Sequence, residues 1–386
     1  MTGAIIAEFN PFHNGHKALI DFAREYGCDG IIAVMSGCFV QRGEPAIAAP
    51  SVRAGAALMS GIDLILENPV TGAMAGARKF AESAVSVIEA TGIADKLFFG
   101  SECGDIELLK KTAAITESKE FSDILRGELM SGKAFAAARE EAVKKICPEA
   151  AEILSNPNDI LGIEYIRALK NSEIEPVCFK RTGVGHDEDA DGVTASAGAL
   201  REMLLNGRDI SDYVPDGCSI SNADIAKKEN AERAVLARLR SASPEEIASA
   251  PDVSEGIENR IYEAARSALT LNDVYDTAKA KRYSHARIRR IVMSFYLGIT
   301  AEDSRIPPQY IAVNGFTDNG REMLKEMRRK ASLPVVMKNS DISSLSEKAK
   351  RIYELECRAN DMYALCFDLP APCGARQRAT PLYFKK

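Results

Sequence analysis

The chain has 386 residues, of which 46% are hydrophobic and 27% are charged, with a net charge of −6. This composition is typical of a soluble globular protein, and the length predicts two domains. No apolar run of about 18 residues and no signal-peptide pattern occurs, so a membrane-spanning helix is excluded and a cytoplasmic protein with no membrane partner is expected.

Short apolar runs alternate with helical patterns in the first half of the chain. Strands that are buried on both faces of a parallel sheet have such continuous apolar runs. We therefore predict an α/β domain with a doubly wound, Rossmann-like parallel sheet, whose ligand site lies beyond the carboxyl ends of the strands. The predicted strands are 3–8, 30–35, 63–67 and 96–99, and the predicted helices are 17–26, 50–60 and 80–90.

The first domain is predicted to span residues 1–205, with a helical insertion at about 105–172. A strand follows at 174–179 and a helix at 196–205. A stretch rich in Gly, Asp and Ser begins at 206, which predicts the domain boundary there. Residues 206–386 form a mainly α-helical second domain in this interpretation. Its predicted helices are 223–241, 254–269, 272–280, 284–297 and 318–331, and two further short apolar runs, 311–313 and 333–336, are candidate strands.

The segment IIAEFNPFHNGH, which ends at His16, is the most informative part of the sequence. A strand ends at Glu8, Pro11 rigidifies the turn, and a helix begins directly after the turn. A helix N-terminus binds phosphate through its free backbone N–H groups, and Gly15 allows a ligand to approach the backbone. Imidazoles at His13 and His16 would stabilise the negative charge that builds up when phosphorus is attacked.

Two other interpretations of this segment are less favoured. The HxxH spacing would suit half of a zinc site, but no third Cys or His ligand lies nearby in the sequence. The nine cysteines form no CxxC pair, which also argues against a disulfide framework. Two unrelated surface histidines are the remaining alternative. We therefore expect no metal site made by the protein itself.

The HxGH pattern after the first strand resembles the nucleotidyltransferase superfamily, which includes class I aminoacyl-tRNA synthetases. An ordered set of motifs in the first half is similar to the bacterial tRNA(Met) cytidine acetate ligase family. In the second half the resemblance is thinner and rests mainly on KRYSHARIRR, residues 281–290. The motifs of the first half are FNPFHNGH, MSGCFVQRGEPA (35–46), FGSE (99–102), NPNDILGIEYI (156–166) and KR (180–181) followed by TASAGALR (194–201).

This resemblance implies a two-step reaction. ATP and acetate would give acetyl-adenylate and pyrophosphate, and the wobble cytidine of elongator tRNA(Met) would then accept the acetyl group on its exocyclic amine. Mg²⁺ is expected to accompany ATP and to neutralise the leaving pyrophosphate. Since the sequence shows no carboxylate cluster, the phosphates would hold the metal.

The resemblance also implies the roles of individual residues. His13 and His16 would be catalytic and would stabilise the pentacovalent α-phosphate. Ser196 and Arg201 would form the second phosphate-binding motif of the superfamily, although Gly198 stands where the family usually has Thr and a hydroxyl is therefore missing. The residues expected to bind ATP are Ile6, Ala7, Glu8, Phe9, Asn10, Pro11, Phe12, Asn14, Gly15, Lys17, Gly100, Asn158, Arg181, Ser196 and Arg201.

Three of these positions have plainer interpretations from the sequence alone. Gly100 would suit a simple turn, and Asn158 would suit the cap of a helix that starts near Ile160. Arg181 would suit an ordinary surface position.

The segment 279–290, KAKRYSHARIRR, is the densest basic patch in the chain. It has six Lys or Arg and no acid, and on a helix Arg282 and Arg289 would share a face. Such a patch would bind RNA phosphates, or it would form a solvated helix face or pair with acidic residues of the first domain. The resemblance favours RNA. The residues expected to bind tRNA are Lys281, Arg282, Arg287, Arg289 and Arg290.

Two competing functions use the same first motif. One is a small-molecule adenylyltransferase that makes a dinucleotide cofactor, and the other is a nucleotide-binding protein without chemistry. An adenylyltransferase would not explain about 180 further residues that include a basic segment. A nucleotide-binding protein without chemistry would give neither histidine a role. The ligase is therefore the favoured function.

Overall fold

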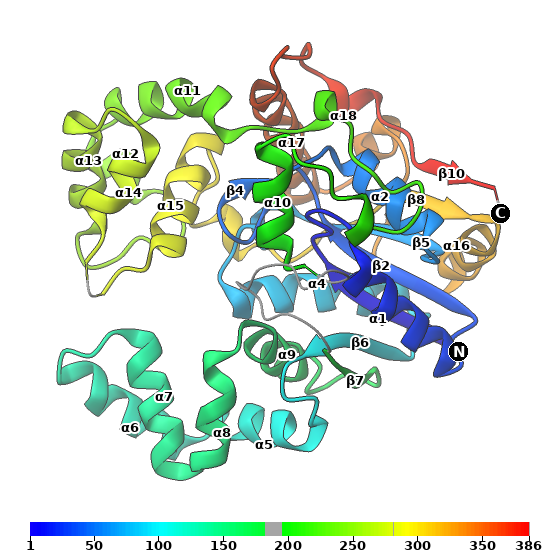
Figure 1. The fold of residues 1–386 in the computed structure, drawn as a ribbon, viewed down its shortest axis with the longest axis horizontal. Helices are drawn as coiled ribbons and strands as arrows, with labels where there is room; N and C mark the ends of the chain where they lie inside the picture. Colours follow the sequence, from blue (N-terminus) through cyan, green and yellow to red (C-terminus); the bar gives the residue numbers. More distant parts are fainter. Residues whose placement is uncertain (182–194, 281, 386) are drawn as a thin grey trace.

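The computed structural model describes residues 1–181, 195–280 and 282–385. A central sheet runs through the molecule in the order β10-β8-β5-β2-β1-β6-β7, with β9 paired to β8 (Figure 1). Neighbouring strands are parallel except for β5 and β8, which are antiparallel. The strands of this sheet are β1 (Thr2–Ala7), β2 (Gly30–Ser36), β5 (Leu64–Asn68), β6 (Lys96–Ser101), β7 (Glu175–Lys180), β8 (Ile311–Thr317), β9 (Val335–Val336) and β10 (Leu382–Phe384).

Strand β2 shows why this sheet is covered on both faces. Successive side chains of a strand point to opposite faces. Ile31 and Ala33 belong to one buried apolar cluster, and Ile32 and Val34 belong to another on the opposite face. The predicted doubly wound α/β fold is therefore confirmed. The first cluster is covered by α1 (Asn14–Glu25), α2 (Pro50–Met59) and α10 (Ala197–Leu205), and the second by α4 (Ala77–Thr91), α9 (Pro157–Ala168) and α16 (Asp318–Lys330).

A helical insertion separates β6 from β7, as predicted for residues 105–172. It extends away from the sheet, and its last helix, α9, packs against α4 and β6 (Figure 1). The first β–α connection of the fold therefore faces the start of α9 across the carboxyl edge of the sheet. The other helices of the insertion are α5 (Ile106–Glu117), α6 (Lys119–Met130), α7 (Phe135–Ile146) and α8 (Pro148–Glu152).

Five helices of the second half form a cluster with its own apolar core at one side of the sheet domain (Figure 1). The helices predicted at 223–241, 254–269, 272–280 and 284–297 all lie here. The chain then returns to the sheet through β8, α16, β9 and β10, so the sheet takes strands from both halves of the sequence. The domain boundary at 206 stays a prediction. The five helices are α11 (Lys228–Arg240), α12 (Pro244–Ala248), α13 (Ile257–Ser267), α14 (Leu271–Ala278) and α15 (His285–Leu297).

The remaining elements surround the carboxyl edge of the sheet. A two-stranded hairpin follows β2, and a 17-residue helix that was not predicted, α17, packs against α15 and a short helix after β5. Together they close the side of the sheet that faces the helical cluster. These elements are β3 (Phe39–Val40), β4 (Glu44–Pro45), α3 (Val70–Ala73), α17 (Glu347–Tyr363) and α18 (Ala375–Arg378).

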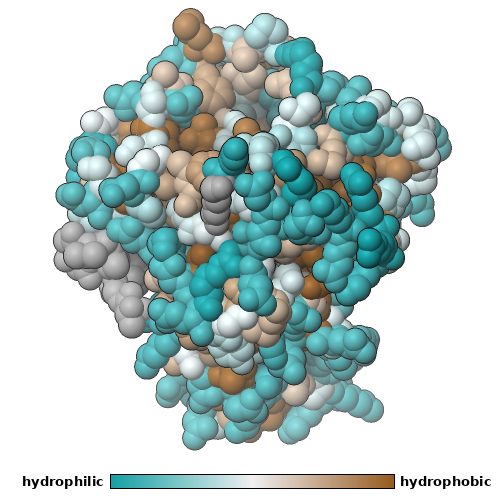
Figure 2. Space-filling model, turned by 90° about the vertical axis from the view of Figure 1, so that its right-hand side faces the viewer, coloured by the Kyte–Doolittle hydropathy of each residue, from teal (hydrophilic) through white to brown (hydrophobic). Residues whose placement is uncertain are grey.

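The surface near the two chain termini is mainly hydrophilic, with hydrophobic residues in smaller groups, as Figure 2 shows. Scattered apolar residues of this kind are normal on a protein surface. In the described part of the chain, no helix is both long enough and apolar enough to cross a membrane.

Candidate active site

The first turn of α1 is built by the two histidines themselves. His13 is the N-cap, with an extended backbone, and its Nδ1 accepts a hydrogen bond from the Gly15 N–H at 3.0 Å. The His16 Nδ1 accepts one from the His13 N–H at 3.3 Å, which completes a capping box. A neutral imidazole whose Nδ1 accepts carries its proton on Nε2. Both rings are therefore fixed as Nε2–H donors.

Gly15 is required by this arrangement. A Cβ at this position would lie 2.9 Å from Cε1 of His13, so any larger residue would push the ring away. The two imidazole rings lie with their centroids 3.9 Å apart. The pair is thus packed too tightly to rearrange without moving the helix start.

The surroundings keep both imidazoles neutral. Burial, with Arg181 and Arg201 nearby, lowers the pKa of His13 to about 3. Burial, followed by the neighbouring His13 and Arg181, lowers the pKa of His16 well below its usual value. At neutral pH the site therefore offers two uncharged imidazole donors to an anionic ligand, beside the guanidinium groups of Arg181 and Arg201.

A cavity of about 430 Å³ opens in front of these donors, at the carboxyl ends of β1, β6 and β7. This is the edge at which parallel α/β sheets bind ligands. The volume falls within the usual range for a small-molecule site. The sequence-predicted residues that line it are His13 and His16 with Ile6, Ala7, Glu8, Phe9, Asn10, Asn14, Gly15, Gly100, Asn158, Arg181, Ser196 and Arg201.

Three predicted ATP-binding residues do not line this cavity. Phe12 is buried and packs against the rings of Phe9 and His16, with centroids 5.1 and 5.5 Å away. Pro11 lies in the same loop, and Lys17 makes an ion pair with Asp21 on the helix surface. Pro11 and Phe12 therefore belong to the loop beside the cavity, and Lys17 belongs to the surface of α1.

A second helix start, that of α10, faces the same cavity. Ser196 is its N-cap and accepts the Ala199 N–H at 3.1 Å. Arg201 donates from Nη1 to the Asn10 carbonyl at 2.7 Å, and the Asn10 Oδ1 accepts the Ile47 N–H at 2.7 Å. Arg201 of α10 therefore braces the loop that holds the histidines.

The FGSE and NPND motifs interlock across the end of β6. The Glu102 Oε1 accepts from the Asn158 Nδ2 at 2.6 Å, and its Oε2 accepts the Asp159 N–H at 3.0 Å. Asp159 is fully buried and accepts in return from the Ser101 Oγ at 2.5 Å and the Glu102 N–H at 3.0 Å. The N-cap of α9 is Asn156. The interpretation of Asn158 as a cap is therefore wrong, because it lies in the first turn and binds Glu102.

Sequence reasoning also missed Arg53, which is 1% exposed although it carries a charge. Its guanidinium donates to the carbonyls of Glu8 at 2.5 Å, Ser36 at 3.1 Å and Ala48 at 2.9 Å. It also donates to the Gly37 carbonyl. One side chain thus ties together the loops after β1 and β2. The signal in the sequence was a single Arg among the small and apolar residues of PSVRAGAALM.

Three arginines of the basic segment contact other parts of the protein, which the sequence did not suggest. Helix α15 begins at His285, so Arg282 is exposed before the helix and does not share a helical face with Arg289. Arg287 donates to the Asp252 carbonyl at 2.8 Å. The Nε of Arg290 lies 3.6 Å from a carboxylate oxygen of the same aspartate, Arg289 pairs with Glu44 at 3.8 Å, and Lys281 lies outside the described residues.

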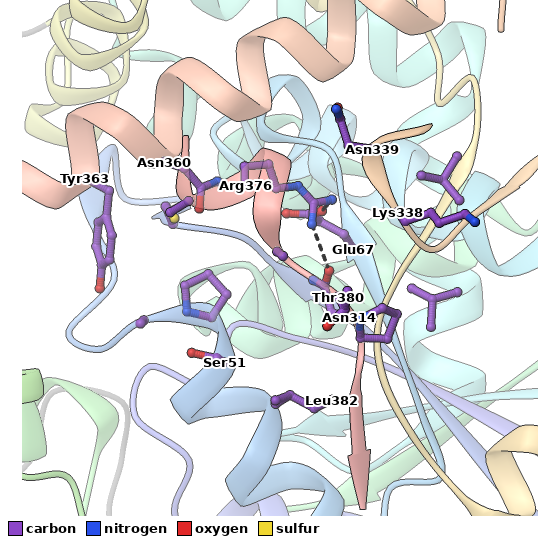
Figure 3. Close-up of a pocket in the computed structure, with 18 of the residues that line it drawn as sticks. Ser51, Glu67, Asn314, Lys338, Asn339, Asn360, Tyr363, Arg376, Thr380 and Leu382 are labelled. Carbon is purple, nitrogen blue, oxygen red and sulfur yellow. Dashed lines mark hydrogen bonds and ion pairs between the residues drawn. The ribbon is translucent and has the colours of Figure 1, made fainter. Parts of the chain in front are cut away.

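A separate cavity of about 290 Å³ lies beyond β5, between β8, α17 and the C-terminal segment (Figure 3). Arg376 forms a buried ion pair with Glu67 there, and its Nη1 lies 3.4 Å from the Asn314 Oδ1. Burial, followed by the nearby Glu67, raises the pKa of Glu356 to about 8. Among the described residues, none lines both this cavity and the histidine site.

Among the residues that the structure describes, no group of three or more His, Cys, Asp or Glu is arranged to hold a metal ion. The anion-binding groups of the main cavity are donors: two imidazole N–H groups, three guanidinium groups (Arg42, Arg181 and Arg201) and two helix starts. Such a site suits a polyphosphate.

Comparisons with known proteins agree with this geometry. The family model described as HIGH Nucleotidyl Transferase matches residues 1–377. The chain is 37% identical to a tRNA(Met) cytidine acetate ligase of Acetivibrio thermocellus over 97% of both proteins. A ligase of the same name from Thermoanaerobacter is 37% identical over 94% of both.

Two solved structures are similar to this chain in three dimensions. Apo TmcAL of Thermotoga maritima matches with a TM-score of 0.93, and the same protein bound with α-thio ATP matches with 0.91. Each match has 32% identity and covers 100% of both chains. The chain therefore belongs to the tRNA(Met) cytidine acetate ligase family, within the HIGH nucleotidyltransferases.

Proposed function

We propose that this chain activates acetate with ATP and transfers the acetyl group to the wobble cytidine of elongator tRNA(Met). The observation that carries the proposal is the pair of neutral Nε2–H donors, His13 and His16, at the mouth of an anion-binding cavity. The relatives named tRNA(Met) cytidine acetate ligase support the substrates, because they match over nearly the whole chain. The structural relative that binds α-thio ATP supports ATP as the ligand of the cavity.

In the first step, acetate attacks the α-phosphate of ATP and pyrophosphate leaves. The Nε2–H groups donate to the α-phosphate oxygens, on which charge builds up, and neutral donors do this without first losing a proton. We propose that Arg181 and Arg201, which line the same cavity, bind the β- and γ-phosphates. We propose the same ATP-binding role for the other predicted cavity residues, with Pro11, Phe12 and Lys17 shaping the loop.

Mg²⁺ is proposed to arrive with ATP and to stay on its phosphates, where it neutralises the pyrophosphate that leaves. We propose that the enzyme works in the cytoplasm, where its tRNA substrate is found.

For tRNA, we propose Arg282, which is exposed, as a phosphate contact. We propose Arg287 as a second contact through its Nη1, because its Nε and Nη2 already donate to the Asp252 carbonyl. Arg289 and Arg290 are held by Glu44 and Asp252, so their contribution is to position the surface around them. Lys281 remains a proposed contact from the sequence.

The test is pyrophosphate release from ATP by the purified protein, with and without acetate and an unmodified elongator tRNA(Met) transcript. Release that needs acetate, with labelled acetyl appearing on the tRNA, is the expected result. Turnover that ignores both substrates but starts with a phosphorylated metabolite would show a cofactor adenylyltransferase in place of the ligase.

Stability should fall in weak acid because both histidines are buried as neutral groups. Above about pH 6.5 neither state of the chain binds a proton at His13, and below it only the unfolded state does until the pH approaches 3. Between pH 6.5 and 5, His13 alone should cost about 2 kcal/mol of unfolding free energy. Urea unfolding of the wild type and of His13→Gln at both pH values measures this difference. Equal losses in the two proteins would contradict the depressed pKa.

Restoring the missing hydroxyl at position 198 should strengthen ATP binding. A Cβ on Gly198 would lie 3.5 Å from the Ser196 Oγ and 3.8 Å from the Arg201 Nη2, which are ordinary contacts, so a side chain can begin at this position without a clash. One added hydrogen bond to phosphate should lower the KM for ATP about 2- to 10-fold. Gly198→Val is the matched control, because it has the same shape without the hydroxyl. A similar gain from Val would show that the hydroxyl is not the cause.

A further inference from the structure

The hairpin of β3 and β4 brings a second set of polar groups to the cavity. Gln41 and Arg42 form its tip, and both line the cavity opposite the histidine loop. The Gln41 N–H donates to the Glu8 Oε1 at 2.7 Å, and the Gly43 N–H closes the turn onto the Val40 carbonyl at 2.9 Å. The backbone of this tip is therefore fixed relative to the end of β1.

The side chain of Gln41 is the unusual part of this tip. Its Nε2 is buried and has no hydrogen-bond partner among the residues that the structure describes. A buried donor without a partner is costly, and native proteins keep few of them. Because the Gln41 side chain lines the ligand cavity, its Nε2–H can donate to an acceptor on the ligand.

The hairpin also lies between the cavity and the basic segment. Glu44 pairs with Lys228 at 3.4 Å and with Arg289 at 3.8 Å. Gly43 has φ of +72°, and a Cβ there would lie 2.5 Å from the Arg290 backbone nitrogen, so only glycine allows this close packing. A polynucleotide that lies on the start of α15 would meet the tip of the hairpin next.

We propose that Gln41, with Glu8 beneath it, forms the subsite that takes the cytosine ring of the acceptor nucleotide. This inference rests on the proposed function. Cytosine presents an acceptor at N3 beside the N4 amine. The Gln41 carboxamide matches both, donating from Nε2 to N3 and accepting one N4–H through Oε1. Uracil presents a donor, N3–H, beside an acceptor, O4. With the amide in the same orientation, the Gln41 Nε2–H would face N3–H, and two donors form no hydrogen bond.

In this subsite Glu8 accepts the proton that the transfer step releases. The N4 nitrogen attacks the carbonyl carbon of acetyl-adenylate, and the new N–C bond forms as the C–O bond to the phosphate breaks. AMP leaves with that electron pair, and the second N4 proton passes to the Glu8 carboxylate. Burial raises the pKa of Glu8, which favours its acceptance of a proton.

The experiment separates the two half-reactions of the full-length protein. Acetate-dependent ATP–pyrophosphate exchange reports the first, and single-turnover transfer of labelled acetyl to a tRNA(Met) transcript reports the second. For Gln41→Ala we expect transfer to fall about 10- to 100-fold relative to exchange, the usual loss of a bidentate base contact. For Glu8→Gln we expect a transfer rate that no longer rises with pH. The matched control is Gln377→Ala, an exposed glutamine far from the cavity, which should change neither rate.

The outcomes are distinct. Equal losses of exchange and transfer in Gln41→Ala would place Gln41 in the ATP site and overturn the proposal, and so would unchanged transfer. Circular dichroism and thermal melting check that each variant is folded before its rates are compared. A wild-type protein without acetate-dependent exchange would overturn the proposed function itself, together with this inference.

Discussion

Replacing His16 with Ala should lower acetate-dependent ATP–pyrophosphate exchange about 10²- to 10³-fold, which is the usual loss of one oxyanion donor. His16 is fixed as a neutral Nε2–H donor because its Nδ1 accepts the His13 N–H. His16→Gln keeps an N–H near the Nε2 position and should therefore lose less activity than the Ala variant.

The matched control is His285→Ala. His285 lies at the start of α15, where its Nε2 is 3.4 Å from Asp276, and it does not line the cavity. Its exchange rate should equal that of the wild type. If folded His16→Ala kept exchange within a few-fold of the wild type, the histidine would have no role in adenylation.

The parts of the fold that sequence predicted are those with a local signal. The run GIIAVMS of β2 is continuous and apolar because both faces of the strand are covered, and that pattern is visible without a structure. The HxGH spacing likewise fixes a capping box between residues three apart. Such features depend on neighbours in the chain, so residue types and spacing suffice.

The missed parts depend on pairings between distant segments. Glu102 and Asp159 are 57 residues apart, and their mutual hydrogen bonds exist only because β6 ends beside the start of α9. Strand β8 joins the sheet antiparallel to β5, from the half predicted to be mainly helical. Such pairings follow from tertiary packing and leave no periodic signal in either segment.

The same limit explains the basic segment. Its six Lys and Arg suggested one exposed helix face, but Ser284 caps α15 and the helix begins only at His285. Asp252 and Glu44 contact three of these arginines. Both residues come from other elements, so no pattern within the segment could indicate these contacts. The density of charge in the sequence therefore identifies the segment, but it does not show which of the charged side chains face solvent.

Arg53→Met should cost at least about 3 kcal/mol of unfolding free energy, because four buried carbonyls would lose their donor and each unsatisfied group costs about 1–3 kcal/mol. Those carbonyls lie after β1, at the end of β2 and directly after it, and before α2, so the loss should also loosen the site. Urea unfolding gives the free energy, and the KM for ATP in the folded fraction should rise.

The matched control for Arg53 is Arg78→Met. Arg78 lies on the exposed face of α4 and pairs with Glu82 one turn away, a surface pair that contributes less than about 1 kcal/mol. Met keeps much of the length and apolar volume of either arginine, so the two variants differ in the hydrogen bonds that are lost. A loss below about 1 kcal/mol for Arg53→Met would mean that water replaces its donors. In that case the loops around the histidines would be held by Arg201 and Asn10, which still join the histidine loop to α10 and to Ile47.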